Sequence, residues 1–141
     1  MYIYILLLFN FILYLIIIMD NLWYKNIKKS RLTPPDYVFG IVWTFLYILL
    51  FVYYYLNITY GFFSQSMLFF YLQMMINVCW TYVFFQRKML KTAFSMIVVI
   101  IIASLLSIYY LKNKQLGILL IPYILWLCLA GYLNLYIILN T

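Results

Sequence analysis

The hydrophobic positions of the chain fall into long apolar runs, which are separated by short polar segments. A helix that spans a membrane needs about 20 predominantly apolar residues. Runs of that length predict an all-α membrane protein, a bundle of five transmembrane helices, with spans at residues 2–19, 37–56, 66–85, 90–110 and 116–139. Because the loops between the spans are short, we expect residues 1–141 to form a single membrane domain.

The first run, residues 2–19, is similar in character to the apolar core of a signal peptide, but it lacks the other features of one. The first basic residue is Lys25, which follows the run, and no small-residue cleavage site comes after it. We therefore expect this segment to stay in the mature protein as a transmembrane helix.

Composition agrees with a location in lipid. Hydrophobic residues make up 70% of the chain and charged residues 8%, whereas a soluble domain carries about 25% charged residues. The basic residues are divided unevenly between the two ends of the predicted bundle. One end holds Lys25, Lys28, Lys29, Arg31, Arg87, Lys88 and Lys91, and the other holds Lys112 and Lys114.

This asymmetry predicts the orientation of the chain in the membrane. Cytoplasmic loops carry the excess of Lys and Arg, so the N-terminus is expected outside and the C-terminus in the cytoplasm. Topology and anionic lipid head groups account for the net charge of +7. We therefore expect the lipid bilayer, and no nucleic acid, as a partner. A bacterial inner membrane is favoured, and a mitochondrial outer membrane is the alternative.

The chain lacks the residues that several kinds of catalytic and metal-binding site need. The chain has no His, and its two acidic residues are both Asp, Asp20 and Asp36, at predicted membrane edges. The usual metal and haem ligands, paired carboxylates and intramembrane proton relays are thereby excluded. Cys79 and Cys128 lie within predicted helices and are expected to be small apolar packing residues. We assign no catalytic residue, metal or cofactor, which leaves binding, passage of an apolar molecule, or chemistry of a bound pigment.

The segment that leads into the second span is built from specific residues. Thr33 and Asp36 have the spacing of a capping box, in which Thr33 would be the N-cap of the helix. Pro34 and Pro35 would then fit the first helical turn.

Three predicted helices each carry a stripe of aromatic, amide or small residues at helical spacing. The stripes are Gly40, Trp43 and Tyr47; Gln73, Asn77 and Trp80; and Tyr123, Trp126, Ala130 and Asn134. Residues three and four apart share one face of a helix, so each stripe predicts either a packed wall or a ligand pocket. For Gln73 and Asn77, hydrogen bonding between helices and lining a pocket remain equal alternatives. Pro122 is expected to bend its helix near the start of the third stripe, and Trp23 is expected to be an interfacial anchor.

Three segments carry a family resemblance. WYKNIKKSRLTPPDYVFGIVWTFLY, LQMMINVCWTYVFF and PYILWLCLAGYLNLYI resemble the motifs of the TspO/translocator protein family, in the same order, over residues 22 to 140. The resemblance implies a bundle of five transmembrane helices, usually dimeric, with a cavity that a loop partly closes. Family cavities bind porphyrins and other flat apolar ligands, and cholesterol in mitochondrial members, although Leu139 here replaces the basic residue of the cholesterol motif that includes Tyr136.

The resemblance and the stripes together name the candidate site. The ligand-binding residues are expected to be Trp43, Tyr47, Asn77, Trp80, Tyr123, Trp126, Ala130 and Asn134. Lys28, Lys29 and Arg31 would meet ligand carboxylates, with ordinary topology charge as the alternative explanation. For a homodimer, Ala103 and Ser107 supply the small-residue spacing that a contact between two copies would use.

The expected function is binding of a tetrapyrrole by a membrane transporter, sensor or regulator, with the porphyrin as ligand and not as cofactor. One alternative is a light-dependent enzyme that degrades porphyrins and uses the pocket tryptophans as electron donors. Another is a structural membrane subunit whose cavity is filled by its own aromatic side chains.

Overall fold

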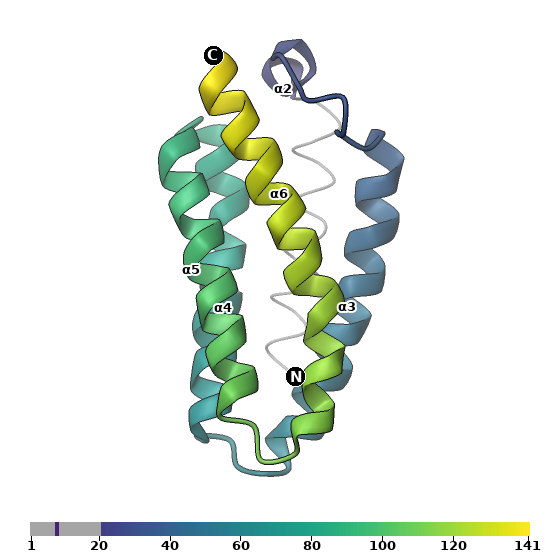
Figure 1. The fold of residues 1–141 in the computed structure, drawn as a ribbon, viewed down its shortest axis with the longest axis vertical. Coiled ribbons are helices and arrows are strands. Elements are labelled where there is room, and N and C mark those ends of the chain that lie inside the picture. The colour runs from purple at the N-terminus through teal and green to yellow at the C-terminus, as the bar shows by residue number, and fades with distance from the viewer. Residues whose placement is uncertain (1–7, 9–20) are drawn as a thin grey trace.

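The computed structural model describes Leu8 and residues 21–141 of the chain, and the regular secondary structure of this part consists of helices only (Figure 1). Its α-helices are α2 (Leu22–Asn26), α3 (Asp36–Ile58), α4 (Gln65–Thr81), α5 (Leu90–Tyr109) and α6 (Ile121–Asn140). A π-helical turn, Tyr82–Gln86, extends α4, and a 3₁₀ helix, Lys114–Leu120, precedes α6.

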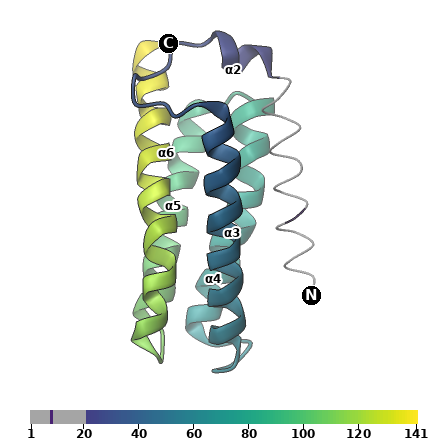
Figure 2. The ribbon, with the colours of Figure 1, turned by 90° about the vertical axis from the view of Figure 1, so that its right-hand side faces the viewer.

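Within the described residues, four helical segments are long and apolar enough to cross a membrane. They are Asp36–Ile58, Gln65–Gln86, Leu90–Tyr109 and Lys114–Asn140. Figures 1 and 2 show them running alongside one another along the long axis of the molecule, with α2 across the end where the C-terminus lies. Four of the five predicted spans are thus confirmed to within a few residues, and the first, residues 2–19, lies outside the described part of the chain.

The predicted capping box at the start of α3 is wrong. The N-cap is Pro35, whose backbone is extended (φ −57°, ψ 151°), and no side chain caps the helix. Instead, the Thr33 N–H donates to the Ser30 carbonyl at 3.0 Å. The physical reason is that Pro35 disfavours the helical conformation at Pro34, so the helix cannot extend back far enough for Thr33 to reach its first N–H groups. Asp36 still lies in the first turn, where a negative charge is favourable.

Pro122 lies in the first turn of α6, immediately after the 3₁₀ helix. A proline is tolerated there because its missing N–H would have no partner within the helix. The bend expected at Pro122 stays a prediction, and what the structure shows there is a change from 3₁₀ to α geometry directly before Tyr123.

Helices α4 and α5 approach each other closely, and small polar residues hold them together at the end remote from the C-terminus. Ser107 Oγ donates to the Ser66 carbonyl at 2.8 Å, and Ser66 Oγ donates to the Ser107 carbonyl at 2.7 Å. The Tyr53 hydroxyl of α3 lies 2.7 Å from Ser107 Oγ, and Asn57 Nδ2 donates to Ser66 Oγ at 2.8 Å. This cluster joins three helices inside the protomer.

The small-residue spacing on α5 is therefore used within the bundle. Ala103 and Ser107 are both buried, so they do not form the exposed stripe that a contact with a second copy would need. Close packing of α5 on α4 is what these small side chains allow.

Large apolar side chains cover the outer faces of the spanning helices, among them Phe45, Ile48 and Leu125. A continuous apolar surface of this kind is suited to lipid. Cys79 and Cys128 are also exposed and unbonded, so the two cysteines lie on the outer surface of the bundle.

Candidate ligand-binding pocket

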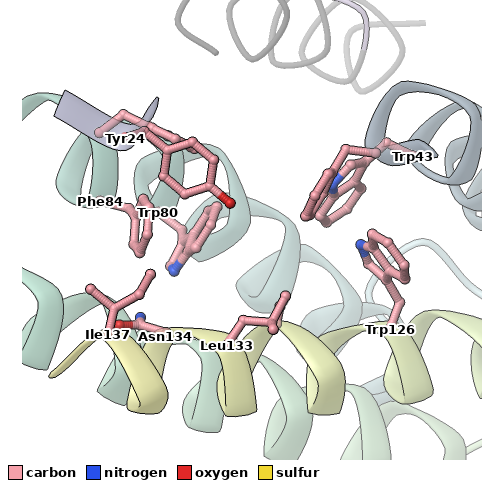
Figure 3. Close-up of a pocket in the computed structure, with 11 residues that line it drawn as sticks. Tyr24, Trp43, Trp80, Phe84, Trp126, Leu133, Asn134 and Ile137 are labelled. Carbon is pink, nitrogen blue, oxygen red and sulfur yellow. The ribbon is translucent and has the colours of Figure 1, made fainter. Parts of the chain in front are cut away.

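An aromatic pocket lies between α3, α4 and α6, at the end of the bundle that α2 covers (Figure 3). Its empty space, counted together with its open mouth, is about 460 Å³. It is lined by Tyr24, Phe39, Trp43, Trp80, Phe84, Phe85, Trp126, Ala130, Leu133, Asn134 and Ile137. A largely apolar concave surface with a few polar atoms is typical of small-molecule sites.

One tryptophan from each of α3, α4 and α6 reaches this space, so the three predicted stripes do converge. Figure 3 shows Trp43 and Trp126 facing each other across the pocket. Trp126 packs edge-on against Phe39, with ring centroids 5.5 Å apart. Trp43 is supported from behind by Tyr47, at 5.4 Å, and by Tyr123, at 6.4 Å.

The α4 wall depends on the π-helical turn at the end of that helix. The Arg87 N–H donates to the Tyr82 carbonyl, five residues back, at 3.1 Å. This wider turn leaves both Phe84 and Phe85 buried, at 4% and 3% exposure. The Trp80 ring stacks on Phe84 at 5.0 Å and meets Phe85 edge-on at 6.1 Å. Single π-helical turns are frequent at functional sites.

Helix α2 covers the pocket, and Asn21 fixes it in place. Asn21 Oδ1 accepts the Tyr24 N–H at 3.1 Å and so caps α2, while Asn21 Nδ2 donates to the Phe85 carbonyl at 3.3 Å. One side chain thus ties the cover to the end of the α4 segment.

Tyr24 is the residue of the cover that faces the pocket. Its ring lies edge-on to Phe85, with ring centroids 5.4 Å apart. Lys29 Nζ lies 4.4 Å from the centroid of the Tyr24 ring. Figure 3 shows its hydroxyl turned toward the space between Trp80 and Trp43. Burial, with a smaller contribution from the charge of Asp36, raises the pKa of Tyr24 to about 12. The group is therefore a neutral phenol at physiological pH.

A second, smaller cavity adjoins the pocket deeper in the bundle. Both are lined by Trp43, Trp80 and Ala130, and the smaller one also by Asn77. Asn77 Nδ2 donates to the Tyr123 hydroxyl at 2.6 Å, and that hydroxyl donates to Gln73 Oε1 at 2.7 Å. Asn77 therefore joins α4 to α6 and also lines a cavity, whereas Gln73 joins helices without lining either cavity.

The residues expected to bind the ligand divide into those that line the pocket, one that lines the adjoining cavity, and those that line neither. Trp43, Trp80, Trp126, Ala130 and Asn134 line the pocket. Asn77 lines the adjoining cavity, and Tyr47 and Tyr123 stand behind Trp43 without lining either space.

Asn134 also forms hydrogen bonds with a neighbouring helix of the bundle. In the orientation that satisfies both ends of its amide, Nδ2 donates to the Leu90 carbonyl at 3.2 Å and Oδ1 accepts the Phe94 N–H at 3.0 Å. Its polar atoms thus bind the backbone of α5, which leaves its side-chain carbons to line the pocket.

The three basic residues proposed for ligand carboxylates lie in the segment between α2 and α3. Lys28 and Arg31 are exposed, and Lys29 packs on the ring of Tyr24. Trp23, expected as an interfacial anchor, is half-buried against Phe84, with ring centroids 5.9 Å apart, and does not line the pocket.

Six lining residues are missing from the set expected from the sequence: Tyr24, Phe39, Phe84, Phe85, Leu133 and Ile137. The sequence does carry a signal for all six, because each of them falls within one of the three quoted motifs. Leu133 and Ile137 follow Ala130 at steps of three and four, so they continue the same face of α6.

The match to a known family agrees with this arrangement. The family described as TspO/MBR matches residues 3–139 of the chain. The chain belongs to the TspO/MBR family. Among TspO/MBR relatives, the tryptophan-rich protein TspO of Bacillus cereus is 35% identical over 120 residues, which are 82% of this chain and 78% of the relative. The protein of that name from Archaeoglobus fulgidus is 32% identical over 79% of this chain and 75% of its own length.

A third TspO/MBR relative, the tryptophan-rich sensory protein of Cereibacter sphaeroides, is 31% identical over 79% of this chain and 72% of its own length. Together with the apolar spanning helices, membership of this family establishes an integral membrane protein.

Proposed function

We propose that this protein binds a tetrapyrrole, or a ligand of similar flat and apolar shape, and acts in the membrane as a sensor, regulator or transporter of it. The observation that carries the proposal is the convergence of three indoles from three helices on one space beneath α2. Aromatic rings stack favourably on flat conjugated ligands. A sensory role is supported by the name of the relative from Cereibacter sphaeroides.

The basic segment beside the cover supplies partners for ligand carboxylates. Lys28, Lys29 and Arg31 follow α2 directly and precede α3. A porphyrin that entered the pocket with its propionates outward would place these carboxylates near cations and water, where a charge need not be desolvated. We propose that the ligand adopts this orientation.

The same end of the bundle is proposed to face the cytoplasm. Figure 2 shows α2, the C-terminus and the start of α3 at one end, and Arg87 and Lys88 follow the π-helical turn at that end. Together with the basic residues after α2, they form the basic side of the protein, which the positive-inside rule assigns to the cytoplasm. The membrane is proposed to be a bacterial inner membrane, and the relatives from Bacillus cereus and Cereibacter sphaeroides support this assignment.

A second candidate function is light-dependent degradation of the bound porphyrin. The observation in its favour is that all three pocket tryptophans line the same space, so a ligand there would contact the side chains best suited to donate electrons to it. Illumination distinguishes the two functions, because degradation by the protein gives a product band that illuminated porphyrin in empty nanodiscs does not give.

The test is a titration of the purified protein in lipid nanodiscs with protoporphyrin IX. We expect saturable quenching of tryptophan fluorescence and a saturable shift of the Soret band. Empty nanodiscs supply the control for porphyrin that dissolves in lipid. Partitioning equal to that of empty nanodiscs would contradict the proposal and favour a structural subunit without ligand.

A further inference from the structure

One buried hydrogen-bond donor of the pocket has no partner. Among the described residues, Trp80 Nε1 and Gln73 Nε2 are buried polar side-chain atoms without a hydrogen bond. Buried donors in native proteins are nearly always paired, so an unpaired one calls for an explanation. Gln73 lines neither the pocket nor the adjoining cavity, whereas Trp80 lines both. Trp80 is therefore the donor that a ligand can reach.

The direction of this donor is held by the surrounding rings. Trp80 stacks on Phe84 at 5.0 Å with an interplanar angle of 22°, and it meets Phe85 edge-on at 85°. Figure 3 shows its nitrogen turned toward α6, near Asn134 and Ile137. Rotation of the indole toward another partner would break both ring contacts, so the N–H is preorganised and loses little freedom when a ligand binds.

The neighbourhood of the donor selects an uncharged acceptor. The lining residues Phe84, Phe85, Leu133 and Ile137 are apolar, and the amide of Asn134 is taken up by the α5 backbone. The Tyr24 hydroxyl, which faces the space beside Trp80, is uncharged. Two cations pack on the cover, Lys29 on Tyr24 and Lys88 on Trp23, and no cation lines the pocket among the described residues. A carboxylate beside Trp80 would be desolvated without a counter-charge, which is strongly unfavourable. A carbonyl group carries no such penalty.

We propose that the Trp80 indole N–H is a specificity-determining donor, which selects flat ligands with a neutral hydrogen-bond acceptor on the edge opposite their carboxylates. This inference rests on the proposed function, because it takes the pocket as the ligand site and assumes that the ligand carboxylates lie beside the basic residues that follow α2. It narrows the ligand class from any flat apolar ring to a carbonyl-bearing one.

The test compares two porphyrins that differ only at that edge. Mesoporphyrin IX carries ethyl groups and diacetyldeuteroporphyrin IX carries acetyl groups, and both keep the two propionates on the opposite edge. We expect wild type to bind the acetyl compound more tightly by about fivefold, as one hydrogen bond predicts. In Trp80→Phe, which keeps a ring but lacks the N–H, the preference should disappear. Trp23→Phe, outside the pocket, should retain it.

The outcomes separate this inference from the proposed function. If both porphyrins bind wild type saturably and the preference is the same in Trp80→Phe, the inference is overturned and the proposed function stands. If neither binds wild type, both fail.

A measurement on wild type covers the case in which Trp80→Phe does not fold. The chain has four tryptophans, so Trp→Phe variants of the other three assign the indole resonance of Trp80 by elimination. A downfield shift of that N–H with the acetyl compound, and none with mesoporphyrin, supports the donor role. Equal spectra with the two ligands would overturn it.

Discussion

The Asn77 side chain of α4 donates a 2.6 Å hydrogen bond to the Tyr123 hydroxyl of α6, and that hydroxyl in turn donates to Gln73 Oε1 at 2.7 Å. One phenol is thus held between two amides that lie one turn apart on α4. Both helices belong to the membrane-spanning part of the chain, where an uncharged amide must find a protein partner. The bridge positions Tyr123 behind Trp43 and so supports the pocket from inside the bundle.

Removing either end of this bridge should destabilise the bundle without additivity. We expect Asn77→Leu to lower the free energy of unfolding by about 0.6 kcal/mol, the average for a hydrogen bond between membrane helices. Tyr123→Phe removes two such bonds and should cost about 1.2 kcal/mol. The double variant should lose less than the sum, because the second change removes a bond already broken. Thermal unfolding in detergent measures all three. Full additivity would show that the two side chains act independently.

The tryptophans inside and outside the pocket should differ in their effect on binding. Trp126 lines the pocket, whereas Trp23 packs on the outer side of Phe84. Ring stacking contributes roughly 0.5–1.5 kcal/mol beyond area burial, so Trp126→Ala should weaken protoporphyrin IX binding about three- to tenfold. Trp23→Ala is the matched control and should change the Kd little. Equal Kd values for two folded variants would remove α6 from the ligand site.

The two hydrogen bonds of Asn21 should be separable. Asn21→Leu removes the cap of α2 and the bond to Phe85, and loss of an N-cap costs about 1 kcal/mol. The backbone amides of Leu22–Asn26 should then exchange with deuterium roughly five times faster than in wild type. Asn21→Asp keeps the capping acceptor but loses the donor, so its exchange should fall between the two. Exchange in Asn21→Leu equal to that of wild type would show that Asn21 does not hold the cover.

The cover should loosen at high pH through Tyr24. The pKa of Tyr24 is raised from 10.0 to about 12 while α2 covers the pocket. When α2 is displaced, the Tyr24 hydroxyl therefore loses its proton at a lower pH than when α2 is in place. The contribution of this group to the stability of the cover is complete below about pH 10 and is lost as the pH rises toward about 12. A spin label at Leu22→Cys, an exposed position, should become more mobile over this range, and Tyr24→Phe should suppress the change.

Two controls make the spin-label experiment specific. Cys79 and Cys128 are exposed and unbonded, so both must be replaced by Ala before labelling. A label at Leu125→Cys, on the lipid-facing side of α6, should report no change with pH. The same rise in mobility in wild type and in Tyr24→Phe would exclude Tyr24 as its source.

The orientation of the protein in the membrane can be tested directly. With an N-terminus outside and a C-terminus in the cytoplasm, a reporter that is active only in the cytoplasm should give signal when fused to the C-terminus and none when fused to the N-terminus. The reverse pattern would contradict the assignment of the basic end to the cytoplasm.

Periodicity and apolar length, which are properties of the sequence by itself, determine much of this protein. The four described spans lie where the apolar runs predict them, because lipid thickness dictates the length of a spanning helix. The spacing of three and four residues places Trp126 and Ala130 on one face of α6, and both line the pocket. These features depend only on the geometry of a single helix.

Only the tertiary structure decides which helix each face meets. The stripe that carries Asn134 turns its amide to the α5 backbone, and the stripe of Asn77 meets Tyr123, although periodicity alone could not choose these partners. The π-helical turn brings both Phe84 and Phe85 inward, which a regular 3.6-residue period does not anticipate. The period of a helix fixes which side chains lie together on its surface, but packing between helices decides what those side chains touch.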